Sequence, residues 1–408
     1  MDSSGGAARA ALRLHAGLRA IDVDSRVIVQ HKTSNDDYIY GPRSRTAKLA
    51  AKARLLIDQL PVIPYWHQSN DVFAPGWLPG NAWRRANEHN PDIIHLHWIT
   101  KAFIGIRDLP RLNAPIIWTL HDMWAFTGGC HYDHDCGRYH GACGRCPVLG
   151  SGYDNDLSRR IQSFKRRTWE GLEMTIVCPS RWLADCAHSS VLLGKQRIEV
   201  IPNGLDLQQF RPMNKASARK QLSIATDDRL ILFGGMGPTT NARKGFAYLQ
   251  AALQQLATAG WNKHSRVIVF GNPGRASPPL ADFRVQYIQP LQRDEELASL
   301  YSAADVFVAP SLQDNLPNTV MEALACGTPC VAFNIGGMPD LIEHQASGYL
   351  ATPRDGKSLA AGIAWVLEDT SRWQQLSHNA RSFTRDHFDL PTISKRYREL
   401  YREILERR

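Results

Sequence analysis

Residues 305–332 read DVFVAPSLQDNLPNTVMEALACGTPCVA. The run Val306–Ala309 is apolar and is broken at Pro310, which predicts a short buried strand. After a polar loop, apolar residues return at helical spacing from about Asn318, and Gly327 ends them. A strand end therefore faces a helix start, which is where open α/β sheets bind ligands, and the free amides of the helix start favour an anion.

Two carboxylates flank this helix start. Asp314 lies on the loop, and Glu322 follows eight positions later within the predicted helix. Across such a loop, one carboxylate can reach a sugar hydroxyl while the other binds a ribose diol. The alternative for Glu322 is a solvated side chain, which the helix dipole favours near a helix N-terminus.

This stretch resembles the signature of retaining GT-B glycosyltransferases of family 4 (glycosyl transferases group 1), of the polysaccharide-biosynthesis type. The signature has an acidic residue, seven further residues, a glutamate and then A-x-A-x-G-x-P-V-V-A. Here Asp314 stands where glutamate is usual, and Cys330 where valine is common. The resemblance covers nearly the whole chain and is strongest over residues 200–350. It implies an α/β protein of the GT-B class, with two Rossmann-like domains that face a cleft.

Length and composition agree with two domains. The chain has 408 residues, of which 43% are hydrophobic and 21% charged. The net charge of +9 suits a phosphate-bearing substrate or an anionic membrane face, or serves solubility alone. We find no nucleic-acid-binding motif. No apolar run reaches the roughly 18 residues of a membrane helix, and MDSSGGAARA lacks the apolar core of a signal peptide. We therefore expect a cytoplasmic protein, with a peripheral contact to the anionic inner face of the membrane.

The N-terminus begins with a glycine turn rather than a strand. Ser3–Ala8 reads as a tight glycine loop, and Ala10–Ile21 as a helix. In a Rossmann domain such a loop follows the first strand, and related glycosyltransferases carry an apolar run there. We hypothesise that the first strand of the N-terminal domain is missing, through a start assigned too late or a truncated gene. The resemblance places Gly5 and Gly6 on the acceptor side of the reaction.

Two predicted strands of the first half carry histidines. In Pro91–Trp98, alternation places His95 and His97 on one face, where they are hydrogen-bonded or, less often, bind a metal. Ala114–His121 is a second predicted strand, and it places His121, a titratable side chain, at the carboxyl end of a strand. The resemblance gives His121 an acceptor-side role in the active site, and the alternative is a purely structural histidine.

A cysteine-rich loop, residues 128–147, reads GGCHYDHDCGRYHGACGRCP. Four cysteines within seventeen residues, ending in C-G-R-C-P, are typical of a small metal-binding loop (a knuckle). In a cytosolic chain this favours a structural zinc ion over disulfides, with free or redox-active thiols as the other alternative. The candidate zinc ligands are Cys130, Cys136, Cys143 and Cys146, and the alternative ligands are His131, His134 and His140.

Basic residues gather in two predicted helical segments. One is a patch at residues 43–54, within an otherwise irregular region from 32 to 80. The other is the amphipathic helix Ser158–Trp169, whose cations either meet anionic lipid headgroups or form a solvated face. The cations of this second helix are Arg159, Arg160, Lys165, Arg166 and Arg167.

The second half repeats a strand–loop–helix pattern. The phrase VIPNGLD, at residues 200–206, matches the family's junction between domains. We therefore expect domains at 1–200 and 201–385, followed by a terminal helix, 386–408, that crosses back to the first domain. Leu230–Phe233 predicts a strand, and the glycine-rich loop after it lets backbone amides approach a diphosphate.

Two cations follow in this loop. Lys244 carries an ammonium suited to phosphate oxygens. The alternative is an exposed lysine, although a cation at a helix start is locally unfavourable. Family members often carry an arginine where Met236 stands, and Arg243 is a candidate replacement.

The resemblance implies retaining transfer of a sugar from a nucleotide-diphosphate sugar to a glycan acceptor, which we expect to be lipid-linked, in surface polysaccharide biosynthesis. No catalytic cofactor is expected, because no D-x-D metal-binding motif lies in a suitable place. Asp133-His134-Asp135 has the D-x-D pattern but lies inside the cysteine-rich loop. The alternatives are a GT-B nucleotide-sugar epimerase and a catalytically silent GT-B binding subunit. The expected catalytic residues are His121, Lys244, Glu322 and Asp314, and the expected donor-binding residues are Gly235, Arg243, Lys244, Asn315, Leu316, Asn318, Thr319 and Glu322.

Overall fold

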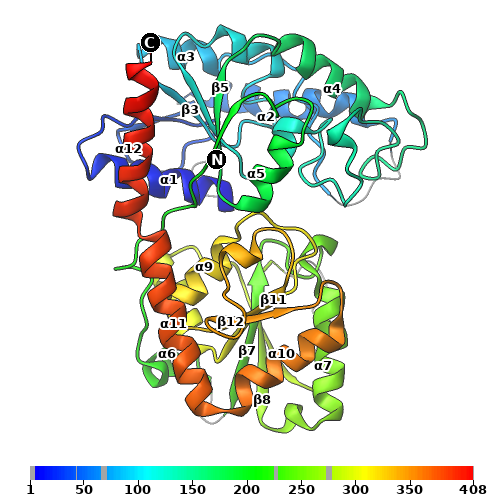
Figure 1. Ribbon diagram of the computed structural model, residues 1–408, viewed down its shortest axis with the longest axis vertical. Coiled ribbons are helices and arrows are strands. Elements are labelled where there is room, and N and C mark those ends of the chain that lie inside the picture. Colours follow the sequence, from blue (N-terminus) through cyan, green and yellow to red (C-terminus); the bar gives the residue numbers. More distant parts are fainter. Residues whose placement is uncertain (1–4, 43, 66–70, 225–227, 273–277, 408) are drawn as a thin grey trace. The chain divides into compact units, whose positions relative to one another are not determined.

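The computed structural model describes residues 5–42, 44–65, 71–224, 228–272 and 278–407. The chain divides into two compact units (Figure 1), Met1–Pro202 with Pro391–Arg408, and Asn203–Leu390. The division falls close to the residue-200 boundary expected from the sequence, and the C-terminal segment belongs to the first unit. Within the described ranges, no helix is both long enough and apolar enough to cross a bilayer.

The first unit is built on a four-stranded parallel sheet of order β3-β4-β5-β6. β1 and β2 form a separate parallel pair. The strands are β1 (Val27–Ile28), β2 (Ile39–Tyr40), β3 (Ile94–Leu96), β4 (Ile116–Thr119), β5 (Met174–Cys178) and β6 (Arg197–Val200). The helices are α1 (Gly6–Arg19), α2 (Arg45–Gln59), α3 (Ala82–Glu88), α4 (Leu157–Thr168) and α5 (Arg181–His188).

The C-terminal helix α12 (Leu390–Glu406) completes the core of the first unit. Its buried residues Tyr397 and Leu400 pack in one cluster with Leu14 of α1 and Ile117 of β4. Tyr397 Oη also lies 3.0 Å from Thr119 Oγ1 on β4. The first unit therefore needs both ends of the chain, because the last helix covers apolar side chains of its sheet.

The second unit has a six-stranded sheet, parallel throughout, of order β12-β11-β10-β7-β8-β9. Read from β9, with β7 counted as the first strand, this order is 3-2-1-4-5-6, which is the Rossmann arrangement, and the strand order reverses between β7 and β10. The strands are β7 (Arg229–Gly235), β8 (Ser265–Gly271), β9 (Arg284–Ile288), β10 (Val306–Ala309), β11 (Cys330–Phe333) and β12 (Gly348–Ala351).

Helices cover this sheet through two apolar clusters. Along β7, Leu230 and Leu232 join one cluster while Ile231 and Phe233 join the other, as the two-residue period of a strand requires. Two successive helices, α10 and α11, meet at Asp369, whose side chain caps the second. The helices are α6 (Lys215–Gln221), α7 (Phe246–Thr258), α8 (Asp294–Ala303), α9 (Asn318–Ala325), α10 (Gly356–Glu368) and α11 (Thr370–Phe388).

Candidate active site

The carboxyl ends of β7 and β10 bring two sequence-predicted site residues into contact. Lys244 ends a short 3₁₀ turn after β7, and Asp314 lies on the loop after β10. Lys244 Nζ is 2.7 Å from Asp314 Oδ2, and Arg243 Nη1 is 3.2 Å from the same oxygen. Because β7 and β10 flank the reversal of the sheet, these charges lie where a Rossmann sheet binds its ligand.

The electrostatics of this cluster favour an ionised carboxylate. Burial opposes ionisation of Asp314, but Lys244 and Arg243 outweigh it and hold the pKa of this carboxyl well below its usual range. Burial lowers the pKa of Lys244, against the attraction of Asp314. Two cations face one carboxylate, so the cluster has a surplus positive charge for an anionic ligand.

Close backbone contacts fix the loops that carry the cluster. Gly245, which follows Lys244, has a φ of +71°, and a Cβ there would lie 1.7 Å from the carbonyl oxygen of Pro310. Gly336 likewise approaches Asp314, whose carbonyl oxygen would lie 2.3 Å from an added Cβ. The amide of Gly337 donates to that same oxygen at 3.0 Å. Glycine is therefore required at both close approaches.

The other predicted donor-binding residues gather around the start of α9. Gly235 ends β7 with a φ of +141°, and a Cβ there would lie 3.9 Å from Thr319 Cγ2. Asn318 begins α9, as the sequence predicted, and its Oδ1 accepts a hydrogen bond from Asn203 Nδ2 at 3.2 Å. On the preceding loop, Asn315 and Leu316 are buried.

Glu322 lies inside the structure rather than on a solvated helix face. Its side chain is 2% exposed, and the hydroxyl of Tyr301 donates to its Oε2 at 3.0 Å. The solvated alternative is therefore wrong. Sequence reasoning missed Tyr301, because a tyrosine on the buried part of helix α8 carries no local signal of a carboxylate partner.

In the first unit, three histidines lie close together at the carboxyl ends of β3 and β4. His97 Nδ1 is 3.0 Å from His121 Nε2, and His95 Nε2 is 2.8 Å from Thr119 Oγ1. His95 Nδ1 is also 2.7 Å from the hydroxyl of Tyr401 on α12. Burial lowers the pKa of His121 to about 4 and that of His95 to about 3. All three are therefore neutral at physiological pH, since His97 shifts in the same direction.

The glycines assigned to the acceptor side lie at the start of α1. Gly5 is the N-cap of this helix with a φ of +97°, and Gly6 is its first residue. Ser3 and Ser4 of the predicted glycine loop lie outside the described residues. Helix α1 begins at Gly6, four residues before the predicted start at Ala10.

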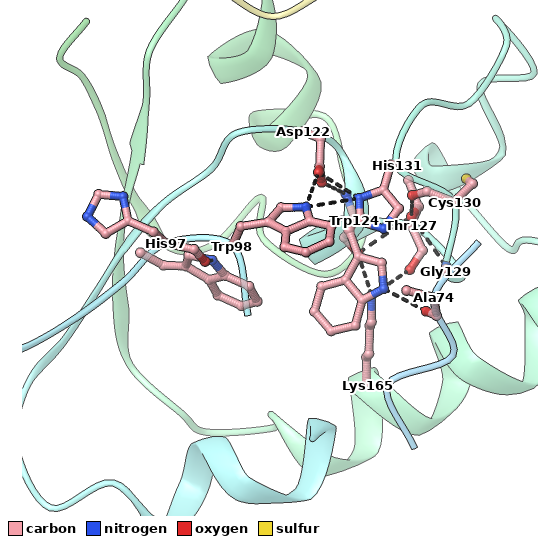
Figure 2. Close-up of polar contacts among 11 residues, drawn as sticks. Ala74, His97, Trp98, Asp122, Trp124, Thr127, Gly129, Cys130, His131 and Lys165 are labelled. Carbon is pink, nitrogen blue, oxygen red and sulfur yellow. Dashed lines mark hydrogen bonds and ion pairs between the residues drawn. The ribbon is translucent and has the colours of Figure 1, made fainter. Parts of the chain in front are cut away.

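Next to His121, the partly buried carboxylate of Asp122 contacts the ring of His131 (Figure 2). Asp122 Oδ2 lies 2.6 Å from His131 Nδ1 and accepts a hydrogen bond from Trp98 Nε1 at 2.8 Å. Burial opposes ionisation of Asp122, but His131 leads the interactions that lower its pKa. One ring nitrogen of His131, an alternative zinc ligand, is therefore already engaged. Nothing in the sequence pattern indicated this pair.

Lys165 was predicted to meet either lipid headgroups or solvent, and both alternatives are wrong for this residue. Its side chain is fully buried, and Nζ donates to the carbonyl oxygens of Trp124 and of Thr127, the latter at 3.1 Å (Figure 2). The ammonium lies 3.6 Å from the centre of the Trp124 ring. Burial lowers the pKa of Lys165 to about 7. The cause is position, because this side chain of α4 faces the loop after β4.

The cysteine-rich loop brings two of its four thiols into contact. Cys130 and Cys146 are hydrogen-bonded, and both are buried with Cys143, whereas Cys136 is half-buried. The described residues include all of 128–147, and among them no group of three or more His, Cys, Asp or Glu side chains is arranged to hold a metal ion. The four cysteines do not converge as zinc ligands here, and zinc stays a prediction.

Comparisons with known proteins agree with this architecture. A family model described as Glycosyltransferase Family 4 matches residues 4–209, and one described as Glycosyl transferases group 1 matches residues 228–369. A D-inositol 3-phosphate glycosyltransferase of Thermobispora bispora is 30% identical over 78% of this chain and 71% of its own length. A protein of the same description from Saccharomonospora viridis is 29% identical over 82% of this chain and 74% of its own length.

Two solved structures share the fold. Sucrose-phosphate synthase from Thermosynechococcus elongatus superposes with a TM-score of 0.71 and 20% identity, over 99% of this chain and 95% of that one. Anabaena Alr3699/HepE, solved in complex with UDP and glucose, gives a TM-score of 0.65 and 17% identity over 98% of both chains. Together with the parallel sheets, these matches establish the GT-B fold. The chain belongs to glycosyltransferase family 4, within glycosyl transferases group 1.

Proposed function

We propose that this chain transfers a sugar, with retention at the anomeric carbon, from a nucleotide-diphosphate sugar to a lipid-linked glycan in surface polysaccharide biosynthesis. The observation that carries the proposal is the Lys244–Asp314 pair at the reversal of the second unit's sheet. Relatives support the donor class, because Anabaena Alr3699/HepE was solved with UDP-glucose and with UDP. The relatives named D-inositol 3-phosphate glycosyltransferase act on a different kind of acceptor, so the acceptor rests on family type and charge.

In this proposal the second unit binds the donor. Lys244 and Arg243 neutralise the diphosphate, because a leaving group that gains charge is stabilised by fixed cations. The free amides at the start of α9 act on the same group. Glu322 accepts hydrogen bonds from the ribose, and Asp314 with the Asn315–Leu316 backbone holds the sugar.

The first unit is proposed to hold the acceptor, through Gly5, Gly6 and His121. The anomeric carbon–oxygen bond to the diphosphate breaks, and a bond to the acceptor oxygen forms on the same face. The acceptor proton passes to an oxygen of the departing phosphate. His121 is neutral at physiological pH because of its burial, so it can form a hydrogen bond with the acceptor without adding a charge there.

A nucleotide-sugar binding screen followed by product analysis tests the proposal. We expect one UDP-, GDP-, ADP- or TDP-sugar to bind, and the anomeric configuration of the donor to be preserved in the glycan product. Isomerised sugar formed without any acceptor would instead identify an epimerase. Donor binding without turnover across an acceptor panel would identify a silent binding subunit.

A structural zinc ion in the cysteine-rich loop is a separate proposal. Its support is the spacing of the four cysteines in the sequence and the close pair Cys130–Cys146, and binding would require the loop to draw its other thiols toward this pair. Metal analysis of the purified protein, beside a variant with all four cysteines replaced, decides it. A folded wild-type protein that contains no zinc would remove the idea.

A further inference from the structure

Helix α2 and the turn after it expose large apolar side chains to water. Leu49 is 68% exposed and Leu56 is 72% exposed. Leu60 and Ile63, just beyond the helix, are 53% and 47% exposed. Leu49, Leu56 and Leu60 follow one another at seven and four residues, which places them on one stripe of a helix. The hydrophobic effect favours covering such a stripe.

The opposite side of the same helix is anchored in the first unit. Asp58 is fully buried, and its carboxylate accepts hydrogen bonds from the amides of Gly76 and Leu78, each at 3.4 Å. Arg54 donates to the carbonyl oxygens of Pro79 and Ala102. The helix is thus fixed by its polar side and presents its apolar side outward, the reverse of an ordinary surface helix.

Cations border the apolar stripe. Arg45, Lys48 and Lys52 are exposed, and the one acidic residue between positions 44 and 64 is the buried Asp58. A stripe of leucines beside exposed cations is the pattern of a helix that lies in a bilayer interface. There the apolar side chains enter the acyl boundary and the cations meet anionic headgroups.

We propose that α2 and the following turn, residues 45–63 (labelled α2 in Figure 1), form a docking surface for an anionic lipid bilayer. The surface deepens the proposed function, since it would bring the chain to a lipid-linked acceptor. A second copy of the chain is a poorer occupant, because a two-fold contact would place Arg45, Lys48 and Lys52 opposite the same cations.

The basic helix α4 lacks the apolar part of this pattern. Its Ile161 is buried, as is Lys165, so the exposed residues Arg166 and Arg167 have no outward apolar neighbours on the helix. α4 therefore provides a matched control, with the same kind of charge on the same unit.

Co-sedimentation with vesicles tests the surface. Wild-type protein is expected to bind phosphatidylcholine vesicles containing phosphatidylglycerol more tightly than pure phosphatidylcholine vesicles. The double variant Leu56→Gln, Leu60→Gln is expected to lose at least about tenfold in binding, because burying a leucine is worth more than one decade. Lys48→Gln and Lys52→Gln should each lose about fivefold. The control pair Arg166→Gln, Arg167→Gln should stay within about twofold, since distant charges are screened.

Several outcomes separate the possibilities. Equal vesicle binding by the leucine variant, at unchanged thermal stability, would overturn the surface. A leucine variant that turns a sedimenting dimer into a monomer without changing vesicle binding would assign the stripe to a second copy. Vesicle binding that depends on these leucines, in a protein that binds no nucleotide-sugar, would remove the proposed function and leave the surface standing.

Discussion

Lys244 Nζ and Asp314 Oδ2 lie 2.7 Å apart although their residues are 70 positions apart in the chain. Each follows a strand that flanks the reversal of the second sheet. The pair holds a cation at the site where the proposed diphosphate leaves, and it ties together two loops that bind different parts of the proposed donor.

Replacing Lys244 with alanine should abolish most transfer without unfolding the chain. A preorganised cation beside a leaving group contributes about 10²–10³-fold to kcat. Transfer assays and circular dichroism on the same preparation measure both effects. Arg243→Met, which keeps the stronger ion pair, is the comparison and should lose less. Full activity in a folded Lys244→Ala protein would remove the donor-site assignment.

Two substitutions distinguish the role of Glu322 in donor binding from its hydrogen bond with Tyr301. Glu322→Ala should lower kcat/KM about 10–100-fold with the fold intact, because hydrogen bonds between the ribose and a charged group disappear. Tyr301→Phe removes only the hydroxyl that donates to Glu322, and should cost a few fold at most. Equal losses in the two variants would show that Glu322 serves Tyr301 rather than the donor.

The partly buried histidines of the first unit predict how stability depends on pH. Burial lowers the pKa of His121 from 6.5 to about 4 and that of His95 to about 3, so the unfolded chain binds more protons than the folded chain between these values and 6.5. Stability should therefore fall as pH drops below about 6.5 and level off near the folded pKa values. Thermal melts across this range, with His95→Gln flattening the slope, provide the measurement.

The same shifts bear on activity. Because His121 remains neutral, transfer should show no titration of this group between about pH 6 and pH 8. A midpoint in that window that vanishes in a folded His121→Gln variant would contradict the lowered pKa.

The C-terminal helix should stabilise the first unit selectively. Deleting residues 391–408 removes Ile393, Tyr397 and Leu400, whose burial is worth about 1.5–3 kcal/mol each. The deletion also uncovers Leu14 and Ile117, which pack against them. We expect the first unit to unfold or aggregate while the second keeps a cooperative thermal transition. Tyr401→Phe, which loses only the contact with His95, should cost about 1 kcal/mol. A deletion variant with two unchanged transitions in calorimetry would refute this role.

Much of the second unit could be predicted from local patterns. The start of α9 at Asn318 and the strands β7 and β10 follow from apolar runs, turns and spacing. Residues 32–80 were less predictable, and β2 was missed there. The apolar side chains of α2 face water, so its sequence lacks the usual relation between apolar spacing and a buried face.

The sequence alone determined the two Rossmann-like halves, because strand and helix periodicity and glycine turns are short-range properties of the chain. It also determined which residue types lie at strand ends. Only the tertiary structure decided that Asp314 meets Lys244 and Arg243, that Tyr301 reaches Glu322, that Lys165 is buried and that the leucines of α2 are not. Those outcomes depend on which elements pack together, and the local sequence around a residue does not indicate which distant residue it will contact.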